Sequence, residues 1–100
     1  MKDDVANNGL IKIPIDGSLD LHTFSPKEIP SLLEEYFKEC LSHGIFQVRI
    51  IHGKGRGVQR RRVNAFLEKN PLVHSYCIAP PEAGGWGATI AFLQDKKKAE

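Results

Sequence analysis

Alternating and near-continuous apolar runs along the chain predict four β-strands. In the first run, Leu19 and Leu21 alternate with Asp20 and His22, which is the period of a strand that buries one face. Three further runs are rich in β-branched and aromatic residues, and they span residues 46–52, 73–79 and 88–93. The apolar character of residues 46–52 is nearly continuous, which favours a central strand.

The first strand is expected to be the second arm of a hairpin. Asp16-Gly17 separates two short apolar runs, residues 10–15 and 18–22, and this dipeptide is a strong two-residue turn signal. Pro14 has no backbone N–H to donate, so the first arm is expected at a sheet edge or only as an extended segment.

Apolar residues at spacings of three and four predict two helices. The first opens with Ser25-Pro26-Lys27-Glu28, a capping-box sequence with proline at the first helical position, and Gly44 supplies its end. Pro30 removes a first-turn hydrogen bond, so either that turn is irregular or the helix proper starts near Pro30. The second helix is predicted over residues 58–69, with Gln59 where the spacing favours an apolar residue.

The order β-α-β-α-β-β predicts an α/β two-layer sandwich, a mixed four-stranded sheet with both helices on one face. Two consecutive crossovers imply parallel pairing at the start of the sheet, and the last strand can close it as an antiparallel partner. The other face is expected to be open, with Asp20 and Arg49 on it and His22 at its end. Strand parity puts His52 on the helix side, although it ends its strand and can turn toward the following loop.

The length of 100 residues and the composition indicate one soluble domain. We expect it over residues 10–94, with disordered ends at residues 1–9 and 95–100. No apolar run approaches the length of a membrane span, and residues 1–9 do not resemble a signal peptide. Cys40 and Cys77 lack a paired spacing, which favours free thiols and a cytoplasmic protein.

A basic, glycine-rich loop, Gly53-Lys54-Gly55-Arg56-Gly57, follows His52 and leads into the second predicted helix. Glycines let a backbone approach a ligand closely, and a helix N-terminus presents unpaired N–H groups and partial positive charge. The net charge is only +2, so the basic character is local, and it is concentrated in Lys54, Arg56, Arg60, Arg61 and Arg62. This pattern predicts a phosphate site, although the spacings of the P-loop and of the dinucleotide-binding fingerprint are both absent.

Two histidines and a carboxylate are expected at the same edge as this loop, because ligands gather where strands of open α/β sheets end. Cleavage of a phosphodiester needs a base, an acid and cations that offset the charge of the transition state. His22 and His52 could share the acid and base work, since histidine titrates near neutrality. Asp20 could orient an imidazole or bind a divalent cation. Trp86, between glycines, is either a base-stacking group or a lid on the sheet edge.

Leu19-Asp20-Leu21-His22 and His52-Gly53-Lys54-Gly55-Arg56-Gly57 together resemble the Smr (small MutS-related) domain family, in a stand-alone member. The segment 84–89, Gly-Gly-Trp-Gly-Ala-Thr, looks like the late glycine-rich turn and strand of that family. The resemblance covers residues 15–93 and implies a fold similar to the C-terminal domain of bacterial translation initiation factor three. The chain departs from the pattern at Thr23, where many members have glycine after the histidine and which is followed here by the bulky Phe24, and at Gln59, where many have an apolar residue.

The resemblance implies nicking or cleavage of nucleic acid, with a functional set of Asp20, His22, His52, Gly53, Lys54 and Gly55. Contacts to the nucleic acid are expected from Gly53, Lys54, Gly55, Arg56, Gly57, Arg49, Arg60, Arg61 and Trp86. The expected partner is DNA or RNA, a ribosome-bound message included. RNA can be cut by its own 2′-hydroxyl without a metal, whereas DNA calls for Mg²⁺ or Mn²⁺ held partly by Asp20. The alternatives are a nucleic-acid-binding module without turnover, and a module that holds a nucleotide.

Overall fold

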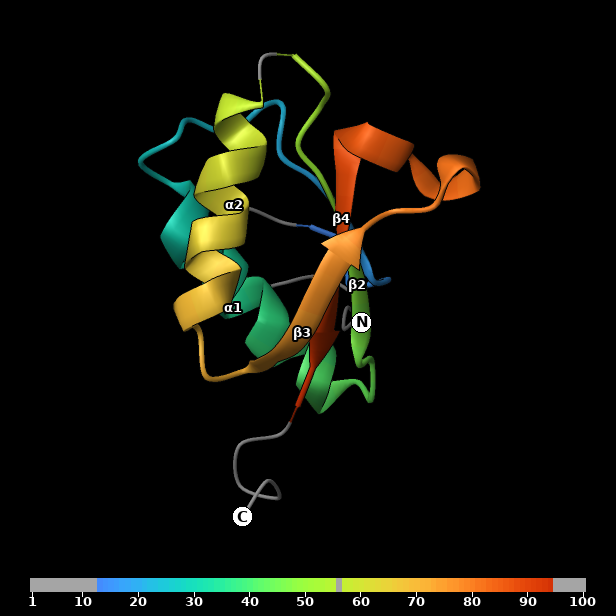
Figure 1. Ribbon diagram of the computed structural model, residues 1–100. Coiled ribbons are helices and arrows are strands. Elements are labelled where there is room, and N and C mark those ends of the chain that lie inside the picture. The colour runs from blue at the N-terminus through green and yellow to red at the C-terminus, as the bar shows by residue number, and fades with distance from the viewer. Residues whose placement is uncertain (1–12, 56, 95–100) are drawn as a thin grey trace.

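The computed structural model describes residues 13–55 and 57–94, and they form a mixed four-stranded sheet with two helices (Figure 1). In chain order the elements are β1 (Ser18–Asp20), α1 (Ile29–Ser42), β2 (Gln47–Ile51), α2 (Val58–Lys69), β3 (Val73–Ile78) and β4 (Ala88–Leu93). Two 3₁₀ turns, Pro81–Ala83 and Gly85–Gly87, lie between β3 and β4. The predicted α/β architecture is confirmed, and the bounds of α2 and β4 agree with the predicted ranges.

The sheet order is β1-β2-β4-β3, which corrects one part of the predicted pairing. β1 and β2 are parallel as expected, but β4 lies between β2 and β3 and is antiparallel to both. The apolar sequence of β4 agrees with this central position, because five of its six residues are buried. β2 has a neighbour on each side, as a central strand should.

The predicted hairpin before β1 is wrong for the residues that the structure describes. Residues 10–12 lie outside the described ranges, and Pro14 forms only an isolated bridge. Asp16 Oδ1 instead accepts the Ser18 N–H at 3.0 Å, and the Gly17 carbonyl accepts the Arg49 N–H at 2.7 Å. The Asp-Gly pair therefore forms a turn, closed by the Asp16 side chain, at the start of β1. The Gly17 carbonyl pairs this turn with β2.

α1 begins at Ile29, so the second of the two alternatives for its start is confirmed. Residues 26–28 form a turn, and Pro30 lies in the first helical turn, where its missing N–H has no intrahelical partner to lose. Half of the capping box is present, since Glu28 Oε1 accepts the Ser25 N–H at 3.3 Å. Gly44, with φ of +75°, follows the helix end as predicted.

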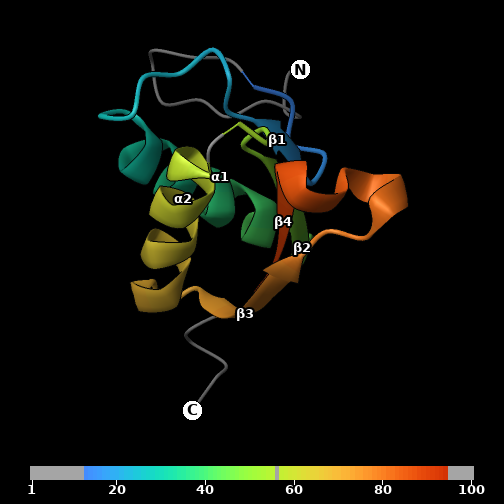
Figure 2. The ribbon, with the colours of Figure 1, turned by 45° about the horizontal axis from the view of Figure 1, so that its top comes forward.

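Both helices lie on one side of the sheet, as the two views show (Figures 1 and 2). The main core fills this interface, and its fully buried members include Leu33, Phe37, Val48, Ile50, Val63 and Ala91. The opposite face carries only a small buried cluster of Ala79, Ala88 and Ile90. Neither helix combines the length and the apolar composition that a membrane span requires among the described residues.

Candidate functional site

Three segments that are distant in the sequence meet at one edge of the sheet, which we call the site edge. Asp20 lies opposite Ile51 in the parallel ladder, and the Leu21 N–H extends it by donating to the Ile51 carbonyl at 2.9 Å. Ile51 in turn lies opposite Ala88, where β4 begins. The loops after β1 and β2 and the turns before β4 therefore leave the sheet together, at the top of Figure 1. This confirms the predicted meeting of the strand ends.

Asp20 and His22 form a hydrogen-bonded pair at this edge. His22 Nδ1 lies 3.0 Å from Asp20 Oδ1, and the same oxygen accepts the backbone N–H of His22 at 3.0 Å. Both hydrogen bonds lower the pKa of the Asp20 carboxyl, and the bond from the backbone N–H has the larger effect. An ionised Asp20 favours the tautomer in which Nδ1 carries the proton, which leaves Nε2 free to accept one. The His22 side chain is 76% exposed, so a substrate can reach it.

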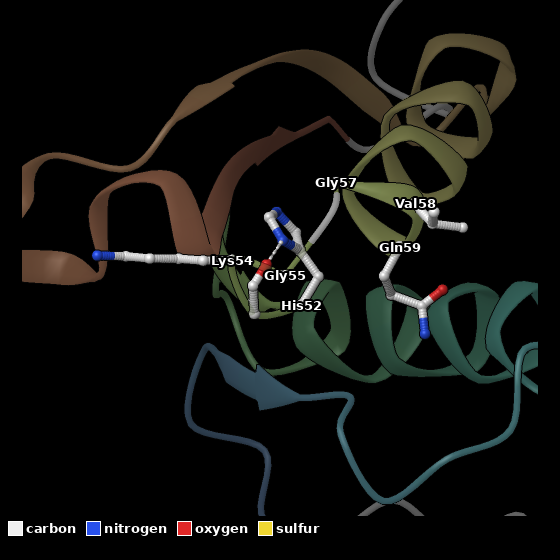
Figure 3. A pocket seen from close by; sticks show the side chains of 7 residues that line it. His52, Lys54, Gly55, Gly57, Val58 and Gln59 are labelled. Carbon is white, nitrogen blue, oxygen red and sulfur yellow. Dashed lines mark hydrogen bonds between the residues drawn. The ribbon is translucent and has the colours of Figure 1, made fainter.

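His52 has a different environment, because its imidazole is buried and both ring nitrogens have partners. Nδ1 lies 3.1 Å from the Gly53 carbonyl, a contact drawn as a dashed line in Figure 3, and Nε2 lies 2.9 Å from Thr89 Oγ1. Thr89 also bonds Asn64 of α2 at 3.2 Å. The pKa of His52 is lowered, mainly because the ring is buried and to a smaller extent because of the positive charge of Arg60. The bond to the Gly53 carbonyl opposes this change by raising the pKa. The ring thus ties the loop to β4 on the helix side, where strand parity places it.

We expect folding stability to fall as the pH drops below about 6.5, in part because of His52. Its pKa is lowered in the folded chain, so in this range the unfolded chain takes up a proton that folded His52 resists. Urea unfolding at pH about 7.5 and about 5.5 should show this loss in the wild type. The loss should be smaller in His52→Gln, which keeps hydrogen-bonding groups without titrating. Equal losses in both proteins would contradict the assignment.

A pocket of about 450 Å³ lies between the loop after β2 and the start of α2 (Figure 3). It is lined by His52, Gly53, Lys54, Gly55, Gly57, Val58 and Gln59. Gly57 is the N-cap of α2, has φ of +81° and offers no side chain to cap the helix. The first-turn N–H groups of α2 therefore remain available to an anion. Gln59 Oε1 is buried without a hydrogen-bond partner in the described structure.

The amides of His52 and Gly53 are not available to a phosphate, because both donate to the Gly87 carbonyl, at 3.0 Å and 2.9 Å. Lys54 borders the pocket, but its ammonium group extends away from His52 (Figure 3). In the part of the chain that the structure describes, Lys54 and Arg61 form no ion pair with an acidic side chain.

A comparison with known families identifies the family of this chain. The model of the Smr domain family matches residues 19–94, which include all three segments of the site edge. The chain belongs to the Smr domain family.

Relatives and solved structures agree with this assignment. The chain is 34% identical over 80 residues to endonuclease MutS2 of Thermomicrobium roseum and 40% identical over 83 residues to that of Halothermothrix orenii. These matches cover 80% and 83% of this chain but only 10% of each relative. The Smr domain of Thermus thermophilus MutS2 superposes with a TM-score of 0.74 at 29% identity, over 80% of this chain and all of that one. YdaL, a stand-alone small MutS-related protein of Escherichia coli, gives 0.72 at 32% identity, over 79% and 65%.

The remaining predicted binding residues of this Smr domain lie in different surroundings. Arg49 lies on the open face as expected, but its guanidinium donates to Ser18 Oγ at 3.1 Å and to the Ala83 carbonyl at 3.2 Å. Arg49 therefore fastens the 3₁₀ turn to β1. Arg60 and Trp86 are in contact, with the guanidinium carbon 4.8 Å from the indole centroid. Arg56 lies outside the described residues.

No group of three or more His, Cys, Asp or Glu side chains gathers to hold a metal ion within residues 13–55 and 57–94. Asp20 is the carboxylate that a divalent cation could use, and one of its oxygens is already occupied by His22. A cation there would need further ligands from substrate phosphates and water, as Mg²⁺ often does. The predicted metal at Asp20 stays a prediction.

The sequence did not lead us to the supporting partners of this Smr site, which are Thr89, Asn64 and the Gly87 carbonyl. One signal was available, since Thr89 is the only polar residue in the apolar run 88–93. A polar side chain in a buried strand needs a hydrogen-bond partner. His52 is that partner.

Proposed function

We propose that this Smr domain binds nucleic acid and cleaves a phosphodiester bond at the site edge. One observation carries the proposal. The parallel ladder between β1 and β2 sets the exposed His22, held by Asp20, beside the strand that leads into the uncapped, cationic start of α2. The Asp20–His22 pair can transfer protons, and the start of α2 can bind an anion. The name of the MutS2 relatives, endonuclease, supports the same chemistry.

The burial and the hydrogen bonds of each site residue indicate its role in the proposed cleavage. His22 transfers protons, because its imidazole is exposed and Asp20 fixes its tautomer. The first turn of α2 holds the phosphate through its free N–H groups. His52 is a positioning residue in this proposal, because its two nitrogens are bonded to Gly53 and Thr89.

The substrate determines the nucleophile. On RNA, His22 would take the proton of the 2′-hydroxyl, which attacks the phosphorus while the bond to the 5′-oxygen of the next nucleotide breaks. That oxygen then takes up a proton from water, and a 2′,3′-cyclic phosphate and a 5′-hydroxyl are formed. On DNA, water must attack, and a divalent cation bound by Asp20 and the substrate would lower the pKa of that water.

A binding module without turnover is the second candidate function, and the burial of His52 favours it. Only one of the two predicted imidazoles is exposed, so a second proton carrier would have to be water or a group of the substrate. Such a module would bind through backbone phosphates, and its affinity would fall linearly with the logarithm of the salt concentration.

We expect RNA cleavage that is lost at a position whose 2′-hydroxyl has been removed. The test compares an RNA oligonucleotide, the same strand with a single 2′-deoxy position, and the matching DNA, each with and without a chelator. Internal attack requires loss of cutting only at the modified position and no effect of the chelator. Cleavage that ignores the 2′-deoxy position but needs the metal would instead indicate attack by water. Tight binding without cutting of any substrate would favour the binding module.

A further inference from the structure

We infer that Trp86 is a stacking platform for an unpaired base, so that this Smr domain prefers single-stranded nucleic acid to a duplex. The inference rests on the proposed function, because it assumes that a phosphate occupies the start of α2. It adds the form of the substrate, which the proposed function leaves open.

Trp86 is exposed where a soluble domain would normally bury a tryptophan. Its exposed fraction is 57%, the largest among the exposed large apolar residues of the described chain. Arg60 covers part of the indole, with its guanidinium carbon 4.8 Å from the ring centroid. The guanidinium lies over one face of the indole, so a base would stack on the exposed remainder of the ring, with the charge of Arg60 close to the phosphate.

The backbone holds Trp86 at a fixed place relative to the pocket. The residue after it, Gly87, accepts the N–H groups of both His52 and Gly53. A Cβ on Gly87 would lie only 3.4 Å from Lys54 Cγ, so the turn packs directly against the loop. The Arg60 guanidinium also packs against Gly57, the N-cap of α2. Indole, guanidinium and helix start therefore form one continuous surface.

This arrangement selects for an unpaired nucleotide. In a duplex each base is stacked between its neighbours, and its π-face becomes accessible only after unstacking, which costs a few kcal/mol. A single strand presents its bases at much lower cost while its phosphate lies at the α2 start. Stacking on aromatic side chains tolerates every base, so we expect a preference for strandedness and not for sequence.

The single tryptophan of the sequence makes the test direct, because its fluorescence reports Trp86 alone. We would titrate the protein with a short single strand, with a strand of the same length that has abasic sites, and with the matching duplex. A non-cleavable backbone keeps the ligand intact. The single strand should quench the fluorescence, whereas the abasic strand should bind more weakly and leave the fluorescence nearly unchanged.

Affinities of variants for labelled oligonucleotides complete the test. Trp86→Ala should weaken single-strand binding by about 5- to 150-fold, and Trp86→Phe should recover most of it. Affinity for the duplex and for the abasic strand should change little. The matched control is Phe46→Ala, which removes another exposed aromatic residue at the far end of β2, beside Leu93. It should bind like the wild type.

The outcomes separate this inference from the proposed function. Oligonucleotide binding that does not depend on Trp86, or an equal loss for single strand and duplex, would overturn the inference and leave the proposed function intact. Failure of every oligonucleotide to bind would overturn both.

Discussion

Replacing His22 by alanine should lower the cleavage rate by about 10²- to 10⁴-fold, the usual contribution of a positioned acid or base. The fold should survive, because the His22 side chain is 76% exposed and leaves no cavity when it is removed. Affinity for a non-cleavable oligonucleotide should stay near that of the wild type, since the phosphate is held at the start of α2. Single-turnover cleavage and equilibrium binding measure the two effects separately.

Two further variants make this test specific. Asp20→Asn keeps the shape but removes the charge that fixes the His22 tautomer, so it should also slow cleavage. His74→Ala is the matched control, because His74 is exposed on β3, outside the site edge, where it bonds Ser75. It should cut at the wild-type rate. Wild-type rates for all three variants would show that the acid or base lies elsewhere.

Replacing Phe37 by alanine should lower the free energy of unfolding by about 3–5 kcal/mol, the usual cost of emptying a buried aromatic site. Phe37 is completely buried in α1, and its ring centroid lies 6.5 Å from that of Phe66 in α2. α2 also packs on the sheet through Val63 and Leu67, its buried residues. The lost contact therefore weakens the helix that presents the phosphate site.

Urea unfolding, followed by circular dichroism, measures this loss as a lower midpoint at unchanged slope. The matched control is again Phe46→Ala, because that side chain is 49% exposed and its removal should change stability by only about 0.5 kcal/mol or less. Similar losses for both phenylalanines would mean that the helix–helix contact does not determine stability.

The parts of the fold that local patterns determine could be predicted from the sequence. α2 and β4 have the predicted bounds, because strong periodicity ends at clear signals, Gly57 before the helix and Asn70-Pro71 after it. The position of β4 could not be predicted in this way, since it depends on which strands pair across the whole chain. The Asp16-Gly17 turn is correctly a turn, but its local signal does not determine which strand β1 pairs with.

The candidate site divides in the same way. The neighbouring ends of β1 and β2 follow from the parallel pairing that the sequence predicts, and the structure has this pairing. That Asp20, His22 and the loop after His52 act on one substrate stays a prediction. The burial of His52 depends on Asn64 and Thr89, which no local pattern connects with it. The hydrogen bonds from Arg49 to Ser18 and Ala83 also join distant segments, so no local pattern predicts them.

The central place of β4 has a consequence for how the protein is made. β4 is the last of the strands to leave the ribosome, yet β2 and β3 are joined only through it. Until residues 87–93 have emerged, β3 has no strand to pair with, and His52 lacks both Thr89 and the carbonyl of Gly87. An unfinished nascent chain therefore carries all the residues proposed for catalysis but not the scaffold that positions them. The proposed activity therefore requires the complete sheet, and we expect none from a chain that ends before this segment.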